Sequence, residues 1–330
     1  MNKPKEINVD TRIRRKTADL RAIADMRLVS LEDGPGRGQR LLLGRNGTGV
    51  NFEVAVDRGF DISALSVNGI NVGWHSPTQM RFPAVDPDSE DGWAFLRNFD
   101  GFMVTCGLDH YSKPRDTDVA HYNHPHLKTV RMPLHGRIST EKSKLLGYGV
   151  NPDTGEIFCE GIVRQAGVFG ETLELQRRIT LAAFQSTLTV VDTVTNRGFR
   201  PTRHAVLYHL NYGYPFLDQN LEIAGLPDPL LSALRSDPPI PDDGYGERVD
   251  NVPANEISEL SPVTLTNPAL GLSVAMDFSR DHLTKLAVWR AYQSGIFALG
   301  VEPKTDSAED RPLLQPGECC RHRLTFEFRA

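Results

Sequence analysis

Short runs of alternating apolar and polar residues, separated by turn signals, make up most of the chain. One such signal is Asn68-Gly69, a dipeptide typical of tight hairpins. Long helical periodicity is nearly absent. The pattern predicts strands over 40–44, 51–56, 61–67, 157–163, 172–181, 186–196, 204–210, 262–265, 272–278, 285–289, 296–303 and 321–328. We therefore expect an all-β protein, a large antiparallel β-sandwich with few short helices.

The chain shows no repeat and no Gly/Ser-rich linker that would divide it. Residues 10–26 interleave Arg and Lys with Ile, Leu and Ala, a pattern that suits a short amphipathic helix or an arm. We expect an N-terminal arm or short helix over 1–26 and a single β-sandwich domain over 27–330. Residues 80–92, 111–133 and 215–259 are rich in Pro and charge, and we expect them to form rim loops around a cleft.

Composition and net charge exclude some classes of binding partner. The 330 residues carry a net charge of −5 and are 39% hydrophobic, so neither nucleic acid nor an anionic membrane is an expected partner. No apolar run is long enough to span a bilayer, and the first residues lead into no secretory h-region. The four cysteines form no C-x-x-C pair, which favours free thiols in the cytoplasm. The sequence leaves a monomer and a homodimer open.

Glu302 is the first candidate for chemistry. It follows the apolar run Ile296–Val301 and precedes Pro303, which cannot donate to a sheet ladder and is expected to end the strand. An acid held at a strand end has the fixed position that a general base needs, although a lone Glu there is commonly just an exposed residue.

Two histidines join Glu302 as candidates. His209 lies in Tyr208–Pro215, which combines a His, an Asn and three Tyr, and His135 precedes Gly136-Arg137. Aromatic faces and hydrogen-bonding groups together suit a sugar. Each feature alone is also compatible with a scaffold role.

These motifs, in this order, resemble the galactose mutarotase (aldose 1-epimerase) superfamily. The resemblance rests on His135-Gly136, on His209 with Asn211 and Tyr212, on Gly300–Pro303 and on Leu314–Glu318. The segments Asp57–Ile62, Trp74–Pro77 and Thr105–Leu108 resemble a poorly characterised bacterial branch of it. The resemblance implies a galactose mutarotase-like supersandwich.

The resemblance also implies a function. An aldose 1-epimerase interconverts sugar anomers by opening and closing the ring, with Glu302 as base, His209 as acid and His135 as a partner for the anomeric oxygen. It implies a small sugar or sugar derivative as partner, with no metal and no other cofactor. The expected substrate-binding residues are Arg58, Asp61, Trp74, Arg137, Asn211, Tyr212 and Arg290.

Three points stay open. Arg290 could bind an acidic or phosphorylated substituent, or pair with a surface acid. Arg58 and Asp61 could be a site pair or a structural salt bridge. The family's sugar-binding Asp has no clear counterpart, with Asp277 and Asp281 only nearby.

Two other functions are compatible with the sequence. His110, His121, His124 and His126 could bind the metal of a sugar isomerase, because imidazole is a common transition-metal ligand. A carbohydrate-binding or sensing protein could use the same sandwich without turnover. The combination of His209 and Glu302 favours the enzyme, since binding alone needs no acid–base pair.

Overall fold

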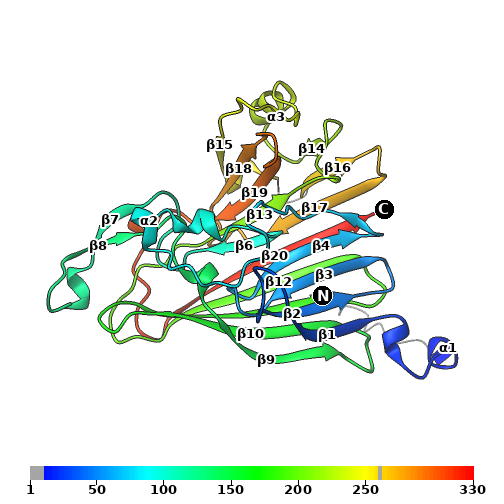
Figure 1. Ribbon diagram of the computed structural model, residues 1–330, viewed down its shortest axis with the longest axis horizontal. Helices are drawn as coiled ribbons and strands as arrows, with labels where there is room; N and C mark the ends of the chain where they lie inside the picture. Colours follow the sequence, from blue (N-terminus) through cyan, green and yellow to red (C-terminus); the bar gives the residue numbers. More distant parts are fainter. Residues whose placement is uncertain (1–10, 259–261) are drawn as a thin grey trace.

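Two large antiparallel sheets make up the fold (Figure 1). This computed structural model describes residues 11–258 and 262–330. Residues 1–10 of the arm predicted over 1–26 lie outside the described residues. The prediction of an all-β sandwich with few short helices is confirmed. Within the described residues, no helix combines the length and apolarity needed to cross a membrane.

The first sheet has ten strands. In spatial order they are β1 (Asp25–Ser30), β2 (Arg40–Arg45), β3 (Val50–Ala55), β4 (Asp61–Val67), β6 (Met103–Cys106), β13 (Leu207–Tyr212), β19 (Ala298–Lys304), β18 (Lys285–Ala291) and β15 (Arg248–Pro253), with β5 (Ile70–Asn71) paired to β4. The second sheet has eight: β14 (Glu222–Ala224), β16 (Val263–Asn267), β17 (Leu272–Phe278), β20 (Cys319–Arg329), β12 (Thr187–Asn196), β11 (Thr172–Leu181), β10 (Ile157–Ala166) and β9 (Ser143–Val150).

The predicted rim loops contain more structure than expected. The segment 215–259 carries β14, β15 and the helix α3 (Asp228–Arg235), and 111–133 carries the hairpin of β7 (Arg115–Asp118) and β8 (Thr129–Met132). The other helices are short: α1 (Thr11–Arg14), α2 (Ser89–Gly92), and 3-10 turns at Leu20–Ala22, Ala94–Arg97, Ala120–Tyr122, Ile138–Thr140, Ala254–Glu256 and Ala308–Asp310. Short strands and a single two-turn helix leave little periodicity for sequence reasoning to detect.

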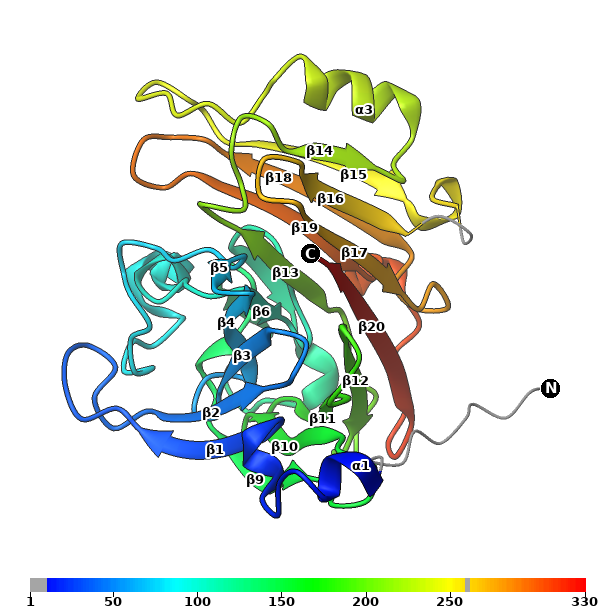
Figure 2. The same cartoon turned by 90° about the vertical axis from the view of Figure 1, so that its right-hand side faces the viewer.

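The main core lies between the two curved sheets (Figure 2). Alternation explains how it forms: along β20 every second residue is buried, from Cys320 to Phe328, while the residues between them face outward. The eight-stranded sheet therefore buries one face.

The ten-stranded sheet buries both faces of its central strands. All six residues of β13 are buried. Tyr208 and Leu210 belong to the core between the sheets, whereas Leu207 belongs to a second apolar cluster on the opposite face with Trp74, Phe95, Phe99, Val104, Cys106, Leu134 and Ala298. This second cluster is built from segments that cover the sheet, and the candidate site lies within it.

A buried ionic network joins the two sheets. Arg177 of β11, with no exposed surface, binds both oxygens of Asp192 on β12 at 2.7–2.8 Å and reaches Asp61 of β4 at 2.7 Å. Tyr208 of β13 donates to Asp192 at 2.6 Å. The charges are therefore paired and hydrogen-bonded, as buried charges must be.

Removing Arg177 should destabilise the protein strongly. Arg177→Met leaves two buried carboxylates without their cation, which costs about 3–5 kcal/mol. The neighbouring Arg178 is the control, because its partners Glu156 and Glu160 are partly exposed and Arg178→Met should cost within about 1 kcal/mol. Urea unfolding of both variants measures the difference, and equal losses would contradict a structural role for the network.

Candidate active site

A cavity of about 220 Å³ opens on the outer face of the ten-stranded sheet. Its lining residues are Trp93, Phe95, Leu96, Phe99, Tyr111, Ser112, Lys113, Leu134, His135, Leu207, His209, Glu247, Val249, Ala287, Trp289, Glu302 and Lys304. The structure thus brings Glu302, His209 and His135 together, from two strands and one loop.

Strand register places His209 opposite Glu302. Leu207 pairs with Lys304 and Asn211 pairs with Gly300, so the intermediate rung joins His209 and Glu302. Thr305 N donates to Val206 O at 3.0 Å, so these two residues form a hydrogen-bonded pair. Hydrogen-bonded and non-hydrogen-bonded pairs alternate along an antiparallel ladder, and His209 and Glu302 stand three positions further on. Their pair is therefore a non-hydrogen-bonded one, in which side chains approach most closely. His209 Nδ1 lies 3.2 Å from Glu302 Oε1.

Pro303 does not end the strand, contrary to the expectation. β19 continues to Lys304. An N–H group on residue 303 would point toward β13, as Thr305 N does. The β13–β19 ladder has no paired residues between Leu207 and Asn211, so no ladder hydrogen bond is lost at Pro303. The proline therefore sits beside an interruption of the ladder, where an absent donor is tolerated.

Glu302 is 3% exposed. Its Oε1 has no hydrogen-bond partner among the described residues, and a Cβ added to Gly300 would stand 2.3 Å from it, so Gly300 provides the space for the carboxyl group. Burial raises the pKa of Glu302 to about 8, and the nearby Lys304 only partly offsets this. With this pKa, the protonated form of the carboxyl group predominates at neutral pH.

His209 is a neutral imidazole. Burial lowers its pKa to about 3, against a smaller opposing effect of Asn211. The amide nitrogen of Asn211 donates to Gly101 O at 2.9 Å, so its oxygen faces His209 Nδ1. That contact requires a proton on Nδ1 and leaves Nε2 as the basic nitrogen. Phe99 and Trp289 pack edge-on to the ring at 4.7 and 5.1 Å between centroids.

His135 is placed by a tight turn. It adopts a left-handed conformation with φ 59°, and a Cβ on Gly136 would lie 2.2 Å from Gly107 O. Only glycine permits that approach, which explains the His-Gly step. The ring lies 5.6 Å from that of His209 and 4.9 Å from Phe95. Burial lowers the pKa of His135 well below its usual value, and His209 adds to this.

Two predicted binding residues support the cavity without lining it. Asn211 orients His209, as described above. Trp74 donates from Nε1 to Ile296 O at 2.6 Å and packs against Phe99 and Trp289. Both act behind the cavity wall.

Tyr212 and Arg290 point away from the cavity, and their assignment to it was wrong. Tyr212 packs between the sheets against Phe102. Arg290 lies on the opposite side of β18 from Trp289 and forms ion pairs with Asp237 and Asp250. Of the two alternatives for Arg290, the structure therefore has the pairing with acids and not a place in this cavity. Strand alternation is the reason in both cases.

Arg58, Asp61 and Arg137 also lie outside the cavity lining. Asp61 serves the Arg177 network, and Arg137 pairs with Asp88 at 2.7 Å. Arg58 is buried and donates to Asn98 O and to Met80 Sδ. Arg58 and Asp61 form no direct salt bridge with each other, but both line a second, very small pocket away from the cavity.

The cavity-lining residues that sequence reasoning missed come from connecting segments and from the strands of the ten-stranded sheet. Trp289 and Lys304 line the cavity; Lys304 stands two residues after Glu302, and two-residue periodicity could have identified it. Tyr111, Lys113 and Glu247 come from segments whose conformation the sequence did not reveal.

The histidine-rich loop is organised locally. His124 Nδ1 accepts the backbone N–H groups of His126 and Leu127 at 3.1 and 2.9 Å. Across residues 11–258 and 262–330, no three or more His, Cys, Asp or Glu side chains are grouped so that they could hold a metal ion. All four cysteines are free thiols.

The chain belongs to the family described as "Domain of unknown function (DUF4432)", whose model matches residues 36–322. No curated protein matches the sequence.

Solved structures share the fold. A Klebsiella pneumoniae protein provisionally named an aldose 1-epimerase aligns with TM-score 0.80 and 21% identity over 98% of this chain and 86% of its own. A galactose mutarotase-like protein from Clostridium acetobutylicum aligns with TM-score 0.63 and 12% identity, over 92% of this chain and 99% of its own. Galactose 1-epimerase from Lactobacillus acidophilus aligns with TM-score 0.54 and 13% identity, over 92% of this chain and 98% of its own. The fold is therefore that of the galactose mutarotase-like proteins, as the motifs indicated.

The raised pKa of Glu302 should make the free energy of unfolding depend on pH. The folded chain keeps a proton that the unfolded chain, with a Glu pKa of about 4.3, has lost, so this group's contribution to stability falls as pH rises toward about 8. Between about pH 6.5 and 8 the unfolding free energy of wild type should fall relative to Glu302→Gln by up to about 1.4 kcal/mol per pH unit. Urea unfolding of both proteins across this window measures it, and parallel curves would show that Glu302 is ionised.

Proposed function

We propose that the protein is an aldose 1-epimerase-like isomerase that interconverts the anomers of a sugar by acid–base ring opening and closing. The observation that carries the proposal is the Glu302–His209 pair: two titratable groups, opposite each other in register and both almost fully buried, in the floor of one small cavity. Pairs with strongly displaced pKa values in a cavity are typical of acid–base sites.

The reaction needs one proton removed and one supplied. Glu302 takes the proton of the anomeric hydroxyl, and the electron pair of the broken O–H bond forms the C=O bond of the aldehyde. The bond from C1 to the ring oxygen breaks, and its electron pair stays on the ring oxygen. His209 protonates the ring oxygen. After rotation about C1–C2, the same steps in reverse close the ring on the other face and return both protons. His135 holds the anomeric oxygen, while the faces of Trp289 and Phe99 suit the apolar side of the ring.

The pair carries the one proton that this scheme requires. Between the pKa of His209, about 3, and that of Glu302, about 8, the two groups share a single proton. Carboxylic acid with neutral imidazole, and carboxylate with imidazolium, contain the same number of protons and interconvert without a change of pH. A sugar hydroxyl that donates to the unpartnered Oε1 of Glu302 favours the ionised form, which is the one the scheme uses.

Loss of either group should slow anomer exchange. Glu302→Gln keeps the side chain's size and removes the base, and His209→Asn keeps a polar group and removes the titrating ring. Each should lower the rate by about 10²–10⁴-fold. Polarimetry or exchange NMR on single anomers measures it, across neutral hexoses, deoxy sugars, uronic acids and sugar phosphates.

Wild type must accelerate at least one of these sugars well above the spontaneous rate. A folded Glu302→Gln that is as fast as wild type would exclude Glu302 as the base. Sugar binding without acceleration would favour the non-catalytic binding protein instead, and loss of activity on chelation would favour the metal-dependent isomerase.

Gly300→Ala should impair the reaction while the fold stays intact. The new methyl group would displace the Glu302 carboxyl group by about 1 Å or more, a misplacement that costs on the order of 10²-fold in rate. Gly147 of β9 is the control, because the nearest atom to an added Cβ there stands at 3.8 Å. Exchange NMR of both variants tests this, and equal activity would show that the position of the carboxyl group is not critical.

A further inference from the structure

Lys304 adds a cation to the same face of β19 that carries Glu302. The two residues are separated by one, so their side chains point the same way and their Cα atoms are roughly 6–7 Å apart along the strand. Both line the cavity. A group bound at Lys304 would therefore lie about one sugar ring's breadth from the anomeric centre at Glu302.

The ammonium group of Lys304 has no carboxylate partner among the described residues. Nζ donates to Asn251 Oδ1 at 2.5 Å and lies 5.6 Å from the centre of the Tyr111 ring. An ammonium has three donors, so two remain for a ligand. The arginines predicted at the site differ: Arg137 and Arg290 are already occupied by aspartates.

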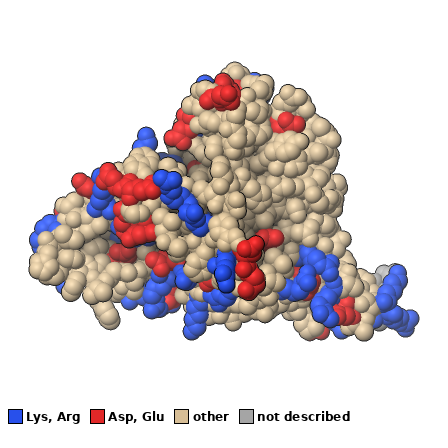
Figure 3. Space-filling model, viewed as in Figure 1, with Lys and Arg blue, Asp and Glu red and all other residues tan. Residues whose placement is uncertain are grey.

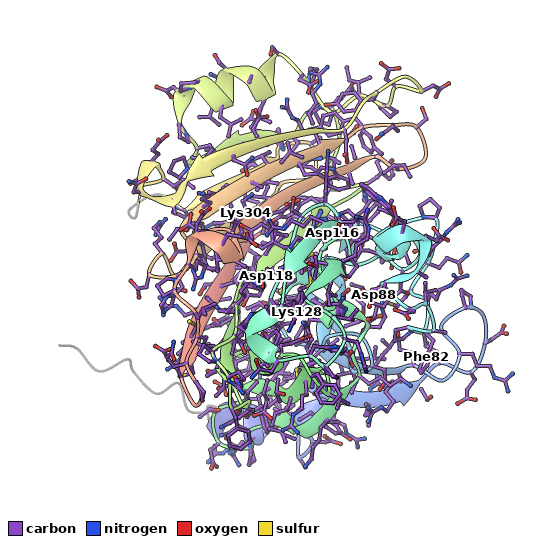
Figure 4. All side chains as sticks on the ribbon, turned by 90° about the vertical axis from the view of Figure 1, so that its left-hand side faces the viewer. Phe82, Asp88, Asp116, Asp118, Lys128 and Lys304 are labelled. Atoms are coloured by element: carbon purple, nitrogen blue, oxygen red, sulfur yellow. The ribbon has the colours of Figure 1, made fainter. Side chains whose placement is uncertain are left out.

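The charge around the cavity is unbalanced. Lys113 contributes a second, exposed ammonium on the segment that follows Tyr111. Figure 4 labels Lys304, which is the last residue of β19. Against these two cations stands the carboxylate of Glu247, which accepts the indole N–H of Trp289 at 3.2 Å. The Glu302–His209 pair adds no net charge, because the two groups share one proton between the pKa of His209, about 3, and that of Glu302, about 8.

We infer that the cavity selects aldoses that carry an anionic group, a carboxylate or a phosphate, at the side of the ring remote from the anomeric hydroxyl, and that Lys304 binds this group. The inference rests on the proposed function only for what happens at the anomeric carbon. Charged hydrogen bonds in a part-buried site are strong enough to separate an acidic sugar from its neutral parent.

Binding and turnover test the inference separately. Dissociation constants for glucose, glucuronate and glucose 6-phosphate, and for the same galactose series, are measured by calorimetry or NMR on Glu302→Gln, which removes turnover. At least one acidic sugar should bind more tightly than its neutral parent. Adding Lys304→Gln should weaken that sugar about 10- to 100-fold and the neutral parent by less than about threefold. The carboxylate and phosphate arms identify the anion.

Two further variants isolate the charge. Lys304→Arg should retain most of the preference, and Lys144→Gln should leave it unchanged, because the exposed Lys144 lies on β9 of the other sheet, outside the cavity lining. Equal weakening of neutral and acidic sugars in Lys304→Gln would make Lys304 a hydroxyl donor and overturn the inference, as would no preference for any acidic sugar. Exchange NMR on wild type separates this inference from the proposed function. If only neutral sugars are accelerated, the epimerase proposal stands and the preference for acidic sugars is overturned. If acidic sugars bind but no anomer exchange is accelerated, the binding preference stands and the epimerase proposal is overturned.

Discussion

Burial of a carboxyl group directly across a rung from an imidazole is the constraint on which the site depends. An ionised carboxylate in an apolar cavity is costly, so Glu302 keeps its proton and His209 stays neutral. The arrangement persists because the surroundings leave the two groups no alternative position. The register fixes their strands, Gly300 provides the space for one, and Asn211 holds the other.

The opposite face of the same strands supplies the rigidity. Tyr208 precedes His209 on β13 and is tied through Asp192 to Arg177, so the strand that carries the imidazole is anchored from behind to the second sheet. On the face drawn in Figure 3, Lys and Arg lie among Asp and Glu in the lower and left-hand parts, and the upper right part carries few charged side chains.

Alternation and turn signals were enough to predict the fold. β4, β11 and β17 have the predicted bounds, because one buried face and a clear turn at each end define a strand locally. The segment 215–259 was taken as a loop, since short strands and one helix held by distant partners have no strong local pattern.

For the site, the sequence identified residues by type but not by direction. His135, His209 and Glu302 were found through motifs, and they share the cavity. Tyr212 stands in the same motif as His209 but faces the other way, because it has the opposite parity in β13. Arg290, which was predicted apart from these motifs, likewise has the opposite parity to the cavity-lining Trp289 in β18. Within β13, alternation alone separates Tyr212 from His209. Which side of β18 faces the cavity depends on how that strand pairs with its neighbours, which only the assembled sheet fixes.

The same logic separates what the fold fixes from what can vary. The Glu302–His209 pair comes from the rung between β13 and β19, in a part of the sheet that is buried on both faces, where a shift of one residue would exchange the residues on the two faces of the strand and turn His209 away from the cavity. Lys113 and Glu247 come from connecting segments and an edge, where substitutions cost little. Lys304 is the exception, because it lies on the central strand itself. A substrate preference placed there is tied to the same register that places Glu302, so reaction and selectivity share one structural element.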